Sequence, residues 1–120
     1  MKVRFILLFI FMISHIYADE DAYNRGEMIY FSNACSSCHG PSAEGSSTYP
    51  KLANKKRVYL KKRLMDFRAG KAKSVSQQMM SQFAKKLTDQ EIDDLSFFLA
   101  THKKVHVEDV ADDILGGFGS

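Results

Sequence analysis

Two cysteines separated by two residues and followed at once by a histidine constrain this sequence more than any other feature: Cys35, Cys38 and His39. Two thiols at this spacing can each form a thioether to one of the two vinyl groups of a single haem, and the next residue then lies under the iron. A neutral imidazole nitrogen of His39 would supply an axial bond, while the two covalent links keep the porphyrin attached. The segment therefore predicts one covalently bound haem.

Three other interpretations of the two cysteines compete with haem attachment. A thioredoxin-like redox pair needs a low-pKa thiolate at a helix start inside a βαβ pattern, and the sequence indicates no such strands. A structural zinc ion needs four ligands, and no second Cys-x-x-Cys or His pair follows at finger spacing. An ordinary disulfide remains as the third alternative, and it would give His39 no role.

The first 18 residues have the organisation of a secretory signal peptide. Lys2 and Arg4 precede an uncharged apolar run that continues to Tyr17, and Ala18 is a suitable residue before a cleavage point. We therefore predict a signal peptide over residues 1–18 and export of the mature protein to the periplasm. A retained membrane anchor is the alternative, although the run is shorter than the roughly 20 residues that cross a bilayer comfortably.

Basic and acidic residues are unevenly distributed along the chain. Cleavage of the signal would remove Lys2 and Arg4, so that 15 of the 17 basic residues would remain against 14 acidic ones. Ten Lys and Arg residues lie between Lys51 and Lys73, where Asp66 is the only acidic residue. We interpret this region as a surface that steers the protein to an acidic partner, with a solvated helix face as an equal alternative. Because an exported protein seldom meets nucleic acid, no nucleic-acid binding is expected.

Hydrophobic periodicity predicts three main helices and no strand. The first runs from about Asp21 to the cysteines, with acidic residues in its opening turn, and either Tyr30 or Phe31 is its inward aromatic residue. The second runs from Arg57 to Ala69, and Gly70 can adopt the left-handed conformation that closes it. A mature chain of this size can bury only a thin core, so a large apolar cofactor would contribute much of it.

The third predicted helix begins at Thr88, whose hydroxyl can cap it while Glu91 reaches back to complete a capping box. Phe97 and Phe98 are both expected to pack in the core. The buried stripe of this helix consists of Ile92, Leu95 and Leu99.

An ordered series of motifs extends from Asp21 to His102, and this part of the chain resembles the small bacterial class I cytochromes c. The resemblance implies an all-α class I cytochrome c fold, in which three main helices wrap around one covalently attached haem c. It places the cytochrome domain at residues 19–102 and leaves 103–120 as a C-terminal extension of unknown role. The motifs are Cys35-Ser-Ser-Cys-His-Gly40, Tyr49-Pro-Lys-Leu-Ala53, Tyr59-Leu60, Phe67-Arg-Ala-Gly70, Met80 and Leu87-Thr-Asp-Gln-Glu-Ile92.

The resemblance also implies roles for residues around the haem. The carbonyl of Pro50 would accept the proton of His39 and so fix the orientation of the ring. Leu52 and Tyr59 would line the haem pocket, and Phe98 would lie where the last helix crosses the first. Two departures from the family pattern affect pocket hydrogen bonds: Asn54-Lys55 replaces a frequent Gly-Gln, and Arg63 replaces a common Gln.

The sixth iron ligand is expected within Gln77-Gln78-Met79-Met80, where two adjacent thioethers cannot both point at one iron. Met80 lies seven residues before Leu87, which is the spacing found in the similar cytochromes, so we predict that Met80 ligates and Met79 packs. His102 and His106 are expected to stay solvated.

A haem held by a His nitrogen and a thioether sulfur has no open coordination position, so such a site carries electrons and catalyses no reaction. The sequence thus predicts a monomeric, non-enzymatic electron carrier that accepts electrons from a respiratory complex and delivers them to an oxidase or peroxidase. Those partners follow from the family alone. Two alternatives stay open: a five-coordinate haem protein that binds gases or peroxide, and a membrane-anchored subunit of a larger complex.

Overall fold

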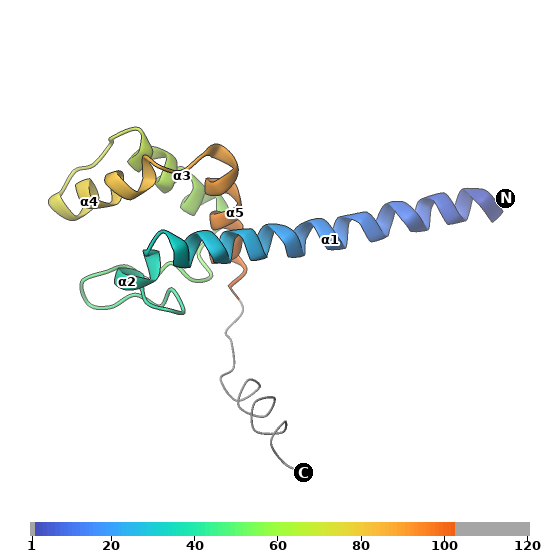
Figure 1. Cartoon of the computed structure of the whole chain (residues 1–120), viewed down its shortest axis with the longest axis horizontal. Helices are drawn as coiled ribbons and strands as arrows, with labels where there is room; N and C mark the ends of the chain where they lie inside the picture. Colours follow the sequence, from blue (N-terminus) through green and yellow to red (C-terminus); the bar gives the residue numbers. More distant parts are fainter. Residues whose placement is uncertain (1, 103–120) are drawn as a thin grey trace, which may run out of the picture.

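The computed structural model describes residues 2–102, and the predicted all-α class is confirmed, because this described part contains helices and no strand. Three main helices, α1, α3 and α5, are joined by two shorter ones. Figure 1 shows the shorter helices α2 and α4 at the same end of the molecule. The helices are α1 (Lys2–Ser32), α2 (Cys35–His39), α3 (Arg57–Arg68), α4 (Val75–Ala84) and α5 (Asp89–Ala100).

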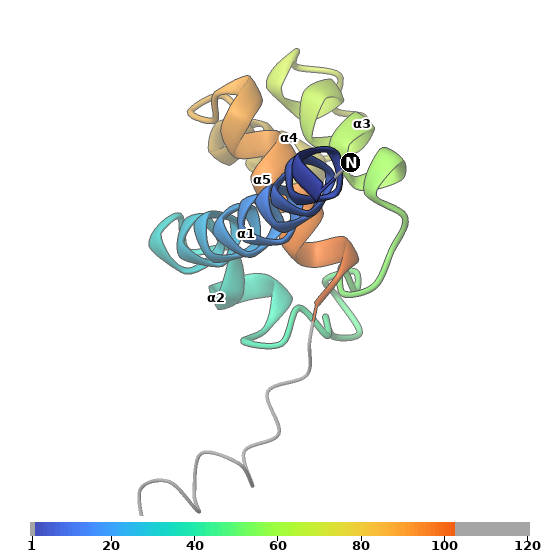
Figure 2. The same ribbon diagram turned by 90° about the vertical axis from the view of Figure 1, so that its right-hand side faces the viewer.

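α1 and α5 cross in direct backbone contact at Gly26. A Cβ atom added to Gly26 would overlap the carbonyl oxygen of Asp94 and would lie 2.6 Å from the Cβ of Phe98. Figure 2 looks along α1 from its N-terminal end and shows α5 passing against it. Only a residue without a side chain allows the two helices to approach this closely.

Aromatic side chains pack on both sides of the crossing. The ring of Phe98 lies 5.0 Å from that of Tyr23 and 5.6 Å from that of Tyr30, between ring centroids. Arg25 adds a polar contact, because its Nε donates a hydrogen bond to the buried Asp94 carboxylate at 2.8 Å. The role expected for Phe98 at the helix crossing is therefore confirmed.

The structure decides which aromatic residues face the core. Tyr30 is fully buried whereas Phe31 is 47% exposed, so Tyr30 is the inward residue of α1. The core position expected for Phe97 is wrong: this side chain is only half-buried. The guanidinium of Arg57 lies 5.1 Å from the centre of its ring, so Phe97 packs under a basic residue of α3 instead.

The ends of α3 and α5 follow the predicted signals. Gly70 has a φ of 77° just beyond α3, and its N–H donates to the carbonyl of Phe67 at 2.9 Å. At the start of α5, Thr88 and Glu91 form the expected capping box, with the Glu91 carboxylate accepting from the Thr88 N–H at 2.8 Å. The stripe of Ile92, Leu95 and Leu99 is buried as predicted.

Helix α4 was not predicted, although its start carries a signal. Ser74 precedes the helix in an extended conformation, and its hydroxyl accepts a hydrogen bond from the N–H of Gln77 at 3.3 Å. The Ser-x-x-Gln pattern is a helix-start signature. The segment that carries Met79 and Met80 is thus a helix rather than a loop between the second and third main helices.

α1 begins much earlier than the predicted start near Asp21. It continues without interruption from Lys2 through Ala18, because the sequence contains no Gly or Pro before Gly26 that would end a helix. Its first half extends away from the other helices, as Figure 1 shows. Within residues 2–102, no helix combines the length and the apolarity that crossing a membrane requires.

Replacement of Gly26 by Ala should destabilise the protein by about 1–3 kcal/mol, because the added methyl group forces α1 away from α5. Urea unfolding of the holo-protein, followed by circular dichroism, measures this loss. The exposed residue Asn24 on the same helix provides the control, since Asn24→Ala adds a good helix former where nothing crowds it. Equal stability of the two variants would contradict the close contact at Gly26.

Candidate functional site

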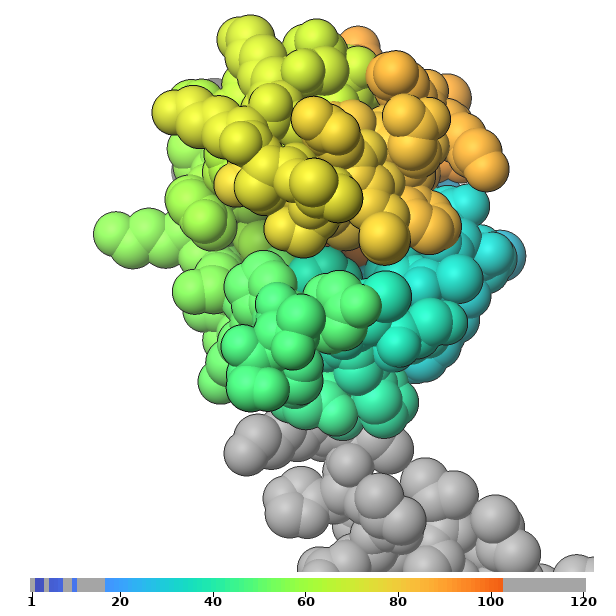
Figure 3. All heavy atoms as spheres, turned by 90° about the vertical axis from the view of Figure 1, so that its left-hand side faces the viewer, coloured from blue at the N-terminus to red at the C-terminus, as the bar shows by residue number. Residues whose placement is uncertain are grey.

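A cavity of about 370 Å³ opens between α2, α3 and α4. This volume lies within the roughly 300–1,000 Å³ typical of cofactor and small-molecule sites. In Figure 3, α4 and the loop that follows α2 face each other across the opening. Every residue predicted to contact the cofactor lines the cavity: Cys35, Cys38, His39, Pro50, Leu52, Tyr59 and Met80.

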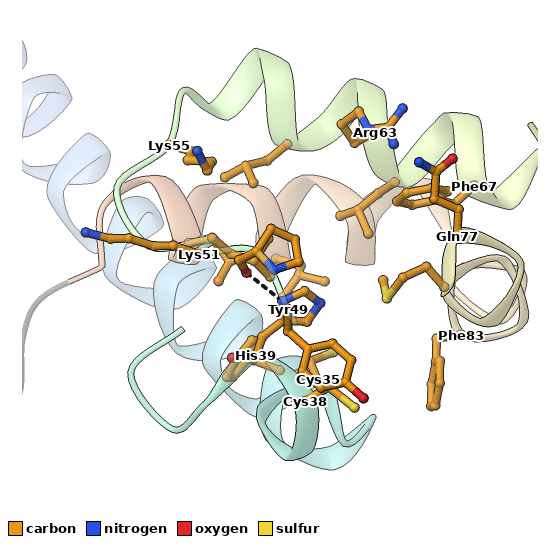
Figure 4. A pocket seen from close by; sticks show the side chains of 18 of the residues that line it. Cys35, Cys38, His39, Tyr49, Lys51, Lys55, Arg63, Phe67, Gln77 and Phe83 are labelled. Atoms are coloured by element: carbon orange, nitrogen blue, oxygen red, sulfur yellow. Dashed lines mark hydrogen bonds between the residues drawn. The ribbon is translucent and has the colours of Figure 1, made fainter. Parts of the chain in front are cut away.

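His39 is held with one ring nitrogen available to the cavity. Its side chain is buried, and Nδ1 lies 2.9 Å from the carbonyl oxygen of Pro50. Because a carbonyl oxygen only accepts, Nδ1 carries a proton and donates, so in the neutral ring Nε2 is the nitrogen that can bind a metal. The hydrogen bond expected between His39 and Pro50 is therefore present, and Figure 4 shows it as a dashed line.

Backbone turns on either side of α2 present the two cysteines and His39 to the cavity. Ala34 adopts a left-handed φ of 58°, which turns the chain between α1 and α2. Gly40 ends α2 with a φ of 90°, and the N–H of Gly45 then donates to the carbonyl of His39 at 2.8 Å. The hydroxyl of Tyr30 donates to the carbonyl of Gly40 at 2.6 Å, so α1 directly supports the end of α2.

The two cysteines line the cavity and form no disulfide with each other. Burial raises the pKa of the Cys35 thiol to about 11, so this group stays protonated at neutral pH. A thioredoxin-like pair requires the opposite, a thiolate with a lowered pKa. Beside them, Tyr49 contacts Cys38, and the hydrogen bond between the two side chains raises the pKa of Tyr49.

Both candidate methionines come from α4, which lies across the cavity from α2. Met79 and Met80 each line the cavity, but Met79 is 52% exposed whereas Met80 is more enclosed. Met28 and Met65 are exposed and do not line it. The expectation that His102 stays solvated is wrong: both of its ring nitrogens are buried, and its ring centroid lies 5.3 Å from that of Phe98, away from the cavity lining. His106 lies outside the described residues.

Several lining residues were missed because α4 was not expected. Ser76, Gln77 and Phe83 line the cavity together with Met80, and Figure 4 shows Gln77 and Phe83 on the side away from His39. The spacing 76, 80 and 83 is the i, i+4, i+7 pattern of one helix face. Once Ser74 and Gln77 are recognised as a helix start, this pattern identifies the residues.

A helical domain that brings a Cys-x-x-Cys-His segment and a methionine to one apolar cavity fits a covalently attached haem. The family model for cytochrome c matches residues 23–103, and the chain belongs to the cytochrome c family. Membership implies a haem c, bound covalently and containing iron. The resemblance to small bacterial class I cytochromes c is thereby confirmed.

Three relatives are similar to the chain. It is 41% identical over 73 residues to a cytochrome c4 of Thiocapsa roseopersicina and 33% identical over 85 residues to a cytochrome c4 of Azotobacter vinelandii, matches that cover 58% and 68% of the chain. The matched part spans 35% and 40% of the length of these two relatives. It is also 31% identical over 86 residues to cytochrome c-554(547) of Halothiobacillus neapolitanus, a match that covers 65% of the chain and 93% of that relative.

Replacement of Tyr30 by Phe should cost about 1 kcal/mol at neutral pH, because it removes the hydrogen bond to Gly40 and leaves that carbonyl with one donor fewer. The cost should shrink above about pH 10. Burial raises the pKa of Tyr30 in the folded protein, so in alkali the unfolded wild type loses a proton that the folded state keeps. Wild-type stability then falls with rising pH by an amount that the Phe variant does not share.

Urea unfolding of both proteins between pH 7 and pH 11 measures this difference. Tyr59→Phe is the matched control, since Tyr59 is 52% exposed and the change keeps the ring that lines the cavity, so stability should be nearly unchanged across the range. The interpretation would be contradicted if the difference in unfolding free energy between the wild type and Tyr30→Phe grew as the pH rises.

Proposed function

We propose that the protein is a monomeric single-electron carrier of the periplasm, which accepts electrons from a respiratory complex and passes them to an oxidase or peroxidase. The observation that carries the proposal is the arrangement of His39, with Nδ1 held by Pro50, on one wall of an apolar cavity and α4 with Met80 on the other. Two opposed ligands leave no position for a substrate. Such a site favours electron transfer over bond chemistry.

Each residue of the cavity has a definite task in this proposal. Cys35 and Cys38 would attach the haem through thioethers, and His39 Nε2 and the Met80 sulfur would bind its iron. Leu52 and Tyr59 exclude water from the site. Haem supplies a one-electron iron couple when it is bound. The protein rearranges little during transfer, because the hydrogen bond to Pro50 keeps the His39 ring oriented.

Export is part of the same proposal. Cleavage after Ala18 would divide α1 and begin the mature chain at Asp19, with three consecutive acidic residues in the first turn of the remaining helix. Negative side chains are favourable at a helix N-terminus. Residues 19–102 then form the cytochrome domain, while the proposed extension 103–120 lies outside the described residues.

The ligand assignment predicts different results for the two adjacent methionines. Met80→Ala should abolish the weak sulfur-to-iron absorption band at long wavelength, lower the reduction potential and let carbon monoxide bind the iron. Met79→Ala should leave all three properties nearly unchanged. Absorption spectra and redox titration of the two purified holo-proteins test this. The reverse pattern would assign the ligand to Met79, and unchanged spectra in both variants would mean that another residue, or none, closes the site.

The basic region of the sequence contributes to partner docking through fewer residues than its ten Lys and Arg suggest. Five of the ten are engaged in ion pairs: Arg57 and Lys61 with Asp93, Lys62 and Lys71 with Asp66, and Arg68 with Asp89. Hydrogen bonds from Lys61 and Lys62 lower the pKa values of Asp93 and Asp66, respectively. Lys51 and Lys55 line the cavity without an ion pair to any described residue, so we assign the steering charge to them.

Electron transfer to the anionic oxidant hexacyanoferrate(III) tests this assignment without knowledge of the partner. The second-order rate constant should fall as ionic strength rises, and it should fall further when Lys51 and Lys55 are both changed to Gln. The matched control is the double change of Lys61 and Lys62 to Gln, which removes the same charge from residues held in ion pairs. A rate constant that does not change with ionic strength would contradict the assignment. An equal fall of the rate constant in both double variants would also contradict it.

A further inference from the structure

The loop between α2 and α3 contacts both Cys38 and His39. The carbonyl of Pro50 accepts the hydrogen bond from His39. The preceding residue, Tyr49, contacts Cys38 through its hydroxyl, and its ring centroid lies 6.2 Å from that of His39. Figure 4 shows the Tyr49 hydroxyl beside the Cys38 sulfur. The Pro50 carbonyl orients His39, whereas electron transfer as proposed above gives the Tyr49 hydroxyl no task.

The backbone of Tyr49 is fixed at several points. Its N–H donates to the hydroxyl of Ser46 at 3.2 Å, and its carbonyl accepts from the Ser46 N–H at 2.8 Å. The proline that follows restricts Tyr49 to extended conformations. A Cβ atom added to Gly45 would lie 2.6 Å from the carbonyl oxygen of Tyr49, so the loop packs closely around this residue. The side chain of Tyr49 therefore extends from a rigid support.

The two cysteines are held in different ways. Cys35 packs against the hydrophobic core, which restricts its side chain. Cys38 lies beside the loop, where the Tyr49 hydroxyl forms a hydrogen bond with its sulfur. A cysteine sulfur has three staggered positions about the Cα–Cβ bond, and a hydrogen bond of ordinary strength favours one of them by roughly two- to tenfold. A thioether sulfur only accepts, so after attachment the Tyr49 O–H is the donor.

We propose that Tyr49 positions Cys38 for haem attachment by donating a hydrogen bond that holds the sulfur towards the cavity. Attachment adds the thiol S–H across a vinyl double bond: the sulfur bonds to one carbon, the hydrogen passes to the other, and no electron enters or leaves. The addition requires the sulfur to lie within reach of the vinyl carbon. The inference rests on the proposed attachment through the two cysteines and adds a residue that neither attaches haem nor ligates iron.

Mass spectrometry of haem-bearing peptides tests the proposal, because it reports which cysteine carries the haem and needs no folded protein. The whole chain is produced in a bacterium that attaches haem to exported cytochromes, and it is then denatured and digested. In Tyr49→Phe, the fraction of haem attached through Cys35 alone should rise by roughly two- to tenfold, because nothing orients the Cys38 sulfur. Thr48→Ala removes a hydroxyl from the adjacent, exposed residue and should leave this fraction unchanged.

Single-cysteine variants separate positioning from a general structural role. Tyr49→Phe should lower attachment in Cys35→Ala, where only Cys38 can react, and should leave attachment unchanged in Cys38→Ala. An equal loss in both backgrounds would overturn the proposal. An unchanged distribution of haem in Tyr49→Phe, or an equal change in Thr48→Ala, would overturn it as well.

The wild-type chain separates the two levels of inference. Haem that leaves the denatured wild type refutes the proposed attachment itself. Wild-type haem bound to both cysteines, together with no effect of Tyr49→Phe, refutes only the role of Tyr49.

Discussion

The contact of α1 with α5 at Gly26 is the constraint on which the rest of the structure depends. A glycine at this point allows Phe98 to pack between Tyr23 and Tyr30 and brings Arg25 to Asp94. Tyr30 then reaches from the crossing to the end of α2 through its hydroxyl. The helix crossing and the haem-attachment segment are therefore parts of one packed unit, to which α5 also contributes the cavity-lining residues Leu95 and Leu99.

The cavity is built from elements that contribute different things. α2 and the loop after it supply the two cysteines, His39 and the carbonyl that orients it, whereas α4 supplies the opposing methionines. α3 contributes apolar lining and Arg63, and ion pairs with Asp66, Asp89 and Asp93 offset part of the positive charge on its exposed side. The charged side chains that line the cavity are therefore few, and all of them are positive.

Local signals in the sequence predicted much of this arrangement. The capping box at Thr88 and the glycine after α3 each depend on a few neighbouring residues, and each is present as expected. Gly26 and Phe97 depend on contacts between helices distant in sequence, so periodicity could not place them. The long start of α1 was missed because the segment was assigned to a signal peptide. α4 was missed although Ser74 and Gln77 mark its start.

The separation of the crossing residues along the chain has a consequence for folding kinetics. Arg25 and Asp94 are 69 residues apart, so nearly the whole domain must be synthesised before the crossing can form. Contacts between such distant residues carry a large loop-closure entropy and slow the folding of small domains. A haem attached to α2 and, as proposed, ligated by Met80 of α4 would shorten that loop, so it would act as a cross-link that speeds assembly as well as a redox centre.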